Sequence, residues 1–369
     1  QGKLDSSRYF IQRAFALNAA QNKQLKNLAH GLSYQYMGDI CSAKGQTDSA
    51  LYYYQAAIRQ MIYTFNSHDV RVNPASYTGV FSVAELYETL LHKAMAFESR
   101  YQQSGALQDV ESALDCYQSI FKLTDYAGKT YGSDEARMAL NLKNYTIHDR
   151  PIRLCLQLYR LTGNRRYERD AFLIDERNKA SVLTANVYEQ EIKKSLHIPD
   201  SLLSAESDAR DQINRLNLLA SQESDSALAA KYQAQMRDLE IRLDAIQLKF
   251  QRYPAYEKLY FQSNIVSPDA MSDSVVPPGT AILSYHRGEK GLLIWCIRRG
   301  SWQAFDKSIS EQFFSHIRKL SSLLQDPSLG NLRETRILAN SLYRELIEPV
   351  RSALTGISSL VIVPDDEIN

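Results

Sequence analysis

The stretch GQTDSALYYYQAAI at residues 45–58 repeats, without gaps, the pattern of GKLDSSRYFIQRAF at residues 2–15. The two copies share their Gly, Asp, Ser, Tyr, Gln and Ala positions. Self-similarity of this kind is typical of repeat architectures, in which each unit needs its neighbours to bury an apolar face. The sequence therefore predicts stacked helical repeats. Because residue 2 aligns with the second helix of a repeat, we expect the chain to begin within a repeat.

The second copy follows a predicted helix at residues 32–44, and the two helices carry small and aromatic residues in a regular order. Gly38 and Ala50 would let the antiparallel helices approach closely, while Tyr54 fills the seam beside them. This order resembles a tetratricopeptide (TPR) helix pair, whose packing positions correspond here to Tyr34, Met37, Gly38, Ala50, Tyr54 and Ala57.

A third copy occupies residues 90–120, with Ala94, Phe97, Ala113, Tyr117 and Ile120 in the corresponding roles. Its two small residues lie further apart than Gly38 and Ala50 do. The copy is therefore predicted to have lengthened helices or a longer turn around Gly105.

Helices are predicted to continue beyond Asp125 without a clean repeat. Ser133 is a candidate N-cap, Pro151 interrupts or restarts the helix, and Gly163 ends it. A long helix at 165–196 follows, and then two helices at about 205–220 and 224–251 joined by SQESDS. The last helix carries a heptad-like stripe, which predicts an antiparallel hairpin packed on itself or on the repeats, or less favourably a dimerising coiled coil: Leu228, Tyr232, Met236, Leu239, Leu243, Ile246 and Phe250.

The composition changes near residue 265. NIVSPDAMSDSVVPPG at 264–279 reads as a linker, and TAILSYHR and LLIWCIRR then flank GEKG as a β-hairpin, with SWQAFDK as a third strand. Ser308 and Glu311 form a potential capping box for a helix that runs to Leu324. A second helix is expected at about 332–350.

Residues 358–369, SSLVIVPDDEIN, contain the unbroken apolar run Leu360–Val363 closed by Pro364. Such a run predicts a strand buried on both faces of a parallel sheet. A buried strand needs neighbours, so we expect the sheet to be incomplete here, with its open edge covered by a remainder of the same polypeptide.

The segment from AILSYHRGEKGLLIWCIRRG to ANSLYRELIEPVRSALTGISSLVIVPDDEIN resembles the opening of the CHAT domain, a caspase-like module found behind TPR arrays in many bacterial proteins. The helical region also resembles what precedes CHAT domains, in the NP at 73–74, the KA at 93–94 and the YGSDEA at 131–136. The resemblance implies a fold that cuts peptide bonds with a His base and a Cys nucleophile at strand ends. Both would lie beyond Asn369.

The expected fold class is mainly α: a TPR-like α-solenoid with a long helical hairpin, followed by the incomplete N-terminal portion of an α/β, caspase-like module. The expected domains are TPR repeats at 1–125, further helical repeats and the hairpin at 126–263, a linker at 264–279, and the first part of a CHAT domain at 280–369.

Two functions remain open from the sequence. The first is the protein-binding, sensing region of a caspase-like cysteine peptidase, and the second is a non-catalytic TPR scaffold with a degenerate CHAT module. In either case a protein or peptide partner is expected in the groove that the first helix of each pair lines. By the resemblance, the groove positions are Gln35, Asp39, Ser42, Glu88, Leu91, Met95 and Glu98. The alternative is that these residues are merely solvated or are covered by neighbouring helices.

The sequence offers no catalytic, metal or cofactor motif within the chain. Cys41, Cys116, Cys155 and Cys296 have no paired spacing and are predicted to be buried and inert. His286 and Cys296 lie on the two arms of the hairpin, but neither matches a catalytic position of the family. The other histidines lack metal-ligand spacing.

The composition narrows the partner classes. A net charge of +1 without a run of five like charges argues against nucleic-acid binding, and no apolar run approaches the ~20 residues of a membrane span. A cytoplasmic location is expected, but the compartment of the native protein stays open because an address could lie outside this chain. The oligomeric state is also open.

Overall fold

The computed structural model describes residues 9–11, 13, 26–130, 147–177, 179, 199–222, 226–250, 265–288, 291–325, 332–365 and 368. The first repeat copy at 2–15, the expected N-cap Ser133 and the end of the helix expected at 165–196 lie mostly or wholly outside these ranges. The described part is mainly helical and contains one four-stranded mixed sheet.

The chain divides into two compact units, each built from two stretches of sequence. The repeat unit comprises Gln1–Thr146 and Val182–Ser263. The sheet unit comprises Ile147–Ser181 and Asn264–Asn369. The helices between residues 147 and 181 therefore belong with the sheet and not with the repeats.

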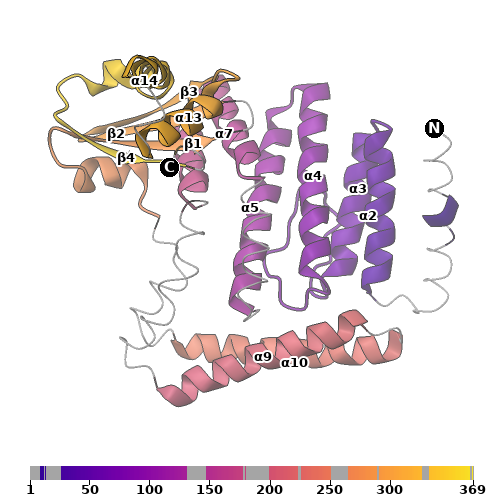
Figure 1. Ribbon diagram of the computed structural model, residues 1–369. Coiled ribbons are helices and arrows are strands. Elements are labelled where there is room, and N and C mark those ends of the chain that lie inside the picture. Colours follow the sequence, from indigo (N-terminus) through magenta and orange to yellow (C-terminus); the bar gives the residue numbers. More distant parts are fainter. Residues whose placement is uncertain are drawn as a thin grey trace. The chain divides into compact units, whose positions relative to one another are not determined.

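The described helices of the repeat unit are α2 (Leu28–Ala43), α3 (Thr47–Met61), α4 (Val83–Ser104), α5 (Leu107–Thr130), α9 (Asp200–Gln222) and α10 (Ser226–Phe250). Helices α2 to α5 lie side by side in chain order (Figure 1). The first pair packs as predicted, because Gly38 lies against Tyr54: a Cβ on Gly38 would be 2.5 Å from ring atom Cε1. Ala50 and Tyr54 are buried.

The second pair, α4 and α5, has the lengthened helices that the third copy predicts. Its helices have 22 and 24 residues, against 16 and 15 for α2 and α3. Gly105 ends α4 in the left-handed conformation (φ 69°), which glycine adopts without a steric penalty. The five packing residues from Ala94 to Ile120 named above are all fully buried.

Residues 62–82, the connecting loop between the two pairs, are held by buried polar contacts. The Lys93 Nζ atom on α4 donates to Gln55 Oε1 at 2.7 Å and to Asn73 Oδ1 at 2.8 Å. The Tyr77 hydroxyl contacts the Ser119 carbonyl oxygen on α5 at 2.6 Å. These hydrogen bonds take the place of the backbone hydrogen bonds that a helix or strand would form, so a long loop can remain ordered.

Helices α9 and α10 form the predicted hairpin and lie side by side (Figure 1). Helix α9 begins at Asp200, directly after Pro199, several residues earlier than expected, because the Pro199 carbonyl oxygen accepts from Leu202 and Leu203. In the stripe on α10, Met236, Leu243 and Ile246 are buried. The hairpin packs on itself, and α10 also contacts the connecting loop.

The sheet unit contains strands β1 (Thr280–Arg287), β2 (Leu292–Arg298), β3 (Ser301–Lys307) and β4 (Ser359–Val363). Their order is β3-β2-β1-β4, with β1 antiparallel to β2 and parallel to β4. The predicted hairpin and third strand are therefore confirmed. The expected linker forms α12 (Pro268–Ala270) and a π-helical turn at Met271–Val275, in which Ser272 is buried.

Helices cover both faces of the central strands. On one face, Leu283, Tyr285 and Cys296 belong to an apolar core with α13 (Phe313–Gln325), α14 (Leu332–Leu346) and the 3₁₀ helix η3 (Glu348–Leu354). On the other face, Trp295 of β2 packs edge-on against Phe172, at 5.3 Å between ring centroids. Phe172 lies on the helix at residues 165–177, which follows α7 (Asp149–Thr162).

Two helix boundaries in this unit differ from the prediction. Ser308 does not cap α13, which begins at Phe313, because Ser310 in between is bonded through its amide and hydroxyl to Glu345 of α14, at 2.9 and 2.6 Å. The helix expected at 332–350 ends at Leu346 and continues as η3, whose first turn contains Pro349. Proline cannot donate the backbone bond that would continue α14.

Strand β4 is parallel, as predicted, but the prediction that it is buried is wrong for this chain. Leu360, Val361 and Ile362 are 42, 46 and 54% exposed. The reason is its position at the end of the strand order, where within the described residues it pairs with β1 alone. Its apolar residues therefore form an open sheet edge.

Candidate functional site

The seven predicted groove residues lie on α2 and α4, the first helices of the two described pairs. On α4 they follow one stripe at helical spacing: Glu88, Leu91, Met95 and Glu98. The α2 stripe adjoins it, since Gln35 Oε1 accepts from the Thr89 hydroxyl of α4 at 3.0 Å. Gln35 is buried and therefore serves packing and not partner binding, whereas Ser42 is exposed.

A polar triad links the two stripes. Asp39 accepts from the Tyr54 hydroxyl at 2.8 Å and lies 2.8 Å from His92 Nδ1. The hydrogen bond with Asp39 raises the pKa of His92 against the opposing effect of burial. The His92 ring therefore carries more positive charge near neutral pH than a free imidazole, beside a carboxylate that remains about one-third exposed (35%).

The rest of the α4 stripe combines apolar and acidic groups. Met95 is 39% exposed and Leu91 is half-buried. Glu98 accepts from the Tyr117 hydroxyl of α5 at 2.5 Å and is not fully buried. We call Asp39, Ser42, Glu88, Leu91, Met95 and Glu98 the binding face: it presents an apolar centre bordered by carboxylates.

The sheet unit contains a second candidate, a buried polar centre around His286. His286 is near the C-terminal end of β1 and is 3% exposed. Its Nδ1 atom lies 3.0 Å from Asp175 Oδ1 and 3.8 Å from Asp365 Oδ2, and its Nε2 atom lies 3.4 Å from Asp149 Oδ1. The contact with Asp175 is an ion pair without good hydrogen-bond alignment, because neither of its two atoms has a hydrogen-bond partner.

The other groups of the centre connect five segments of the sheet unit. Lys179 donates to Asp175 at 2.8 Å and to the Ser284 hydroxyl at 2.7 Å. Trp295 Nε1 donates to Asp175 Oδ2 at 2.7 Å, and the Arg287 amide donates to Asp365 at 2.8 Å. The centre thus joins β1, β2, α7, the helix at 165–177 with Lys179, and the residues that follow β4.

Charge pairing outweighs burial in this centre. Burial alone would lower the pKa of His286, but Asp175, with Asp149 and Asp365, raises it to about 9. Burial would raise the pKa of Asp175, but Lys179 and His286 hold it well below its usual range. At neutral pH His286 is therefore protonated and cannot accept a proton as a general base.

Cys296 cannot serve as a nucleophile for His286. Cys296 lies in the apolar core on the face of α13 and α14, whereas His286 lies on the face of the helix at 165–177. Alternate residues of a strand point to opposite faces, so the two side chains cannot meet. Burial also raises the pKa of the Cys296 thiol. All four cysteines are buried and free, as predicted.

The other histidines offer no further candidate site among the described residues. His316 contacts the Ser341 hydroxyl at 3.1 Å, His68 contacts Arg59, and His197 lies outside the described residues. In the described ranges, no cluster of His, Cys, Asp and Glu could hold a metal ion. None of the described helices is long and apolar enough to cross a membrane.

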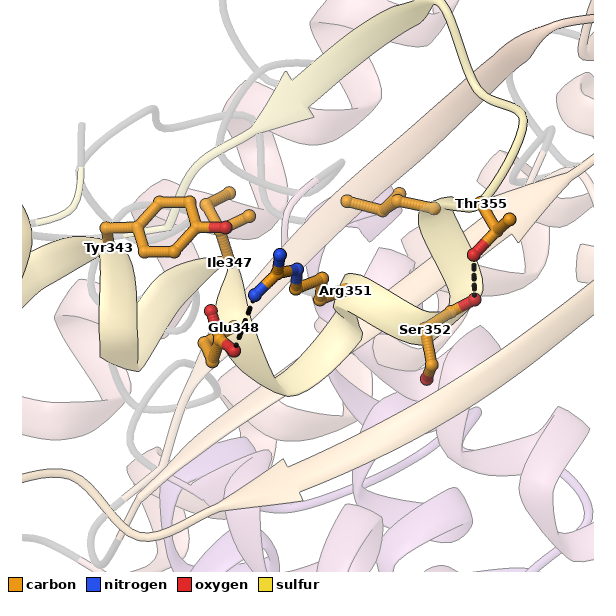
Figure 2. Close-up of a pocket in the computed structure, with 7 residues that line it drawn as sticks. Tyr343, Ile347, Glu348, Arg351, Ser352 and Thr355 are labelled. Carbon is orange, nitrogen blue, oxygen red and sulfur yellow. Dashed lines mark hydrogen bonds and ion pairs between the residues drawn. The ribbon is translucent and has the colours of Figure 1, made fainter.

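Figure 2 shows an open hollow beside α14 and η3, lined by Tyr343, Ile347, Glu348, Arg351, Ser352, Leu354 and Thr355. Its charged side chains are turned toward one another: Arg351 bonds to Glu348 at 3.3 Å. The Thr355 hydroxyl donates to the Ser352 carbonyl oxygen at 3.1 Å. With its polar groups paired locally, the hollow has no convergent set of groups for a ligand.

Sequence reasoning considered His286 but missed the carboxylates around it. Asp149, Asp175 and Asp365 lie far apart in the sequence, and only their contacts identify them. One signal was present: Ser284 and His286 are polar at alternate positions of an apolar strand, which indicates a polar partner on that face. The spacing of Asp175 and Lys179 also suits an i,i+4 ion pair.

Comparison with known proteins gives no relative for this chain. The sequence matches no protein-family model, and no curated protein or solved structure matches it. The class of protein therefore has to be inferred from the fold and from these two sites.

Proposed function

We propose that the repeat unit is a protein-binding scaffold of the TPR type, which holds a segment of a partner protein across α2 and α4. The observation that carries the proposal is the helix packing, with Gly38 against Tyr54 in the first pair and Ala94, Ala113 and Tyr117 buried in the second. Packing of this kind sets first helices side by side, and stacked first helices offer a continuous face to an extended or helical peptide.

The chemistry of the binding face indicates what the partner segment carries. Leu91 and Met95 offer apolar area, and Asp39, Glu88 and Glu98 place carboxylates around it. His92 lies beside the face and is bonded to Asp39. A segment with an apolar side chain flanked by Lys or Arg would complement both features.

The role of the sheet unit follows from its sequence resemblance to the opening of a CHAT domain. In the proposal, the repeat unit is the sensing region of a caspase-like cysteine peptidase whose base and nucleophile lie beyond Asn369. The buried Cys296 and the protonated His286, on opposite faces of the sheet, favour a non-catalytic role for the present residues.

The test uses a phage-displayed library of random peptides selected on the full chain, followed by titration calorimetry of the enriched peptides. Met95→Glu should weaken their binding at least about tenfold, which is about 1.4 kcal/mol, because it puts a charge at the apolar centre of the face. The matched control is Tyr52→Glu on α3, where an exposed aromatic lies outside the face. Tyr52→Glu should change the dissociation constant of the peptides by no more than about twofold.

Enriched peptides should be rich in Lys and Arg. If no peptide is enriched, or if Met95→Glu and Tyr52→Glu weaken binding equally, the binding face is assigned wrongly.

A further inference from the structure

Helix α10 touches the connecting loop through a short row of side chains on one of its faces. The Gly79 amide donates to Glu240 Oε2 at 2.9 Å. One turn further along, Asp244 Oδ2 lies 3.5 Å from the Thr78 hydroxyl. One turn before, the Arg237 guanidinium lies over the Tyr63 ring, 5.3 Å from its centroid. These contacts hold the α9/α10 hairpin against the connecting loop.

Glu240 is the buried member of this row. It is 3% exposed, although a carboxylate is almost never fully buried unless a cation pairs with it. The groups that face it are Arg237 and Asp244 on α10 itself, the Tyr126 hydroxyl on α5 and the Gly79 amide of the loop. The Gly79 amide donates to Glu240, and the Arg237 guanidinium lies nearby over the Tyr63 ring. Asp244 adds a second carboxylate.

This environment favours the neutral carboxylic acid. Burial, with a smaller contribution from Asp244, raises the pKa of Glu240 to about 7, against the opposing effects of the Gly79 hydrogen bond and the nearby Tyr126 hydroxyl. The docked hairpin therefore binds a proton that an exposed glutamate, with a pKa of about 4.3, would not hold near pH 6. A raised carboxyl pKa gives stability that is complete below the pKa of the exposed group and is lost as the pH rises through about 7.

We propose that docking of the α9/α10 hairpin on the connecting loop is coupled to the uptake of one proton by Glu240. At mildly acidic pH the neutral carboxyl group is buried without an unpaired charge, and the hairpin stays docked. Above neutral pH the same burial requires an ionised carboxylate beside Asp244, and the contact loosens. The proposal concerns the hairpin and is independent of partner binding on α2 and α4.

The test is amide hydrogen exchange at Gly79 in the full chain at pH 6 and pH 8, corrected for the intrinsic pH dependence of exchange. Protection of the Gly79 amide should be about tenfold higher at pH 6, as follows from the two pKa values above. The Gly105 amide, which donates to Tyr101 at the end of α4, serves as an internal reference and should not change.

Two variants separate Glu240 from other groups. Glu240→Gln keeps the shape but cannot ionise, so the protection of Gly79 should be equal at the two pH values. Asp238→Asn removes one charge from an exposed position of α10 and should behave as the wild type.

Equal protection of Gly79 at pH 6 and pH 8 in the wild type would overturn the proposal. So would a change that Glu240→Gln retains or that Gly105 shares. If Glu240→Gln fails to fold, the wild type and Asp238→Asn still decide, because a tenfold change confined to the loop supports the coupling and its absence refutes it.

Discussion

Two of the buried basic side chains of this protein, Lys93 and His286, come from different units and have opposite surroundings. Lys93 in the repeat unit is fully buried, and His286 in the sheet unit is 3% exposed. The Lys93 ammonium group is bonded to the neutral oxygens of Gln55, Asn73 and Val72. His286 is instead surrounded by the carboxylates of Asp149, Asp175 and Asp365.

The difference shows that burial alone does not decide the protonation state of a buried base, because the charge of its neighbours determines whether the effect of burial prevails. Burial alone would lower the pKa of both groups. For Lys93 it prevails, because neutral oxygens only partly compensate, and the pKa stays lowered. For His286 the carboxylates prevail, and the pKa is raised to about 9. The first environment organises a loop, whereas the second is a buried ion network.

Removing one carboxylate from the ion network should have the largest effect. Asp175→Asn leaves Lys179 and His286 buried without their main counter-charge, and we expect the free energy of unfolding of the sheet unit to fall by about 3–5 kcal/mol. Urea unfolding followed by tryptophan fluorescence measures it, because both tryptophans, Trp295 and Trp302, belong to this unit.

The matched control is Asp170→Asn on the same helix, where the carboxylate pairs with the exposed Arg166 at 3.5 Å. Its effect should stay below about 1 kcal/mol. A loss for Asp175→Asn no greater than for Asp170→Asn would show that the network adds nothing to stability.

Raising the pH should move the two units in opposite directions. The stability that protonated His286 contributes is complete below its unfolded pKa of about 6.5 and is lost as the pH rises through about 9, which amounts to roughly 2–4 kcal/mol between pH 6.5 and 10. Lys93 has the opposite sign: its lowered pKa means that the folded repeat unit gains stability as the pH rises toward the unfolded value of about 10.4.

Tryptophan fluorescence follows the sheet unit, and hydrogen exchange of peptides from α4 and α5 follows the repeat unit, at a series of pH values from 8 to 10. If both units lose stability in parallel, the two environments do not differ as described.

Removing the buried lysine should have the smallest of the three effects. Lys93→Met removes the ammonium group and its hydrogen bonds to the side-chain oxygens of Gln55 and Asn73. Asn73 keeps the weak donor Cys116, so we expect a loss in the free energy of unfolding of about 1–3 kcal/mol. No unpaired ion remains, so the loss should be smaller than for Asp175→Asn. Hydrogen exchange across the connecting loop measures this loss of stability. The control is Lys122→Met at an exposed position of α5, which should change the stability by no more than about 0.5 kcal/mol.

The parts of the fold that the sequence predicted are those set by local patterns. Helix pairs, the α9/α10 hairpin and the β-hairpin follow from apolar periodicity and turn residues, and Gly38 with Tyr54 follows from the size of the side chains. The predicted helix boundaries were wrong where a residue distant in sequence forms a contact. Glu345 bonds to Ser310, for example, and α13 begins only at Phe313. The binding face stays a prediction, although the structure assigns Gln35 to packing.

What the sequence determined by itself is therefore the kind of each element and which of its faces is apolar, because these depend on neighbours within a few residues. Only the tertiary structure decided that the helices at 149–177 pack on the sheet and that β4 has an open edge. It also decided that His286 meets three aspartates and that Glu240 meets Gly79. The protonation states of these groups depend on charges that come together only when distant segments fold.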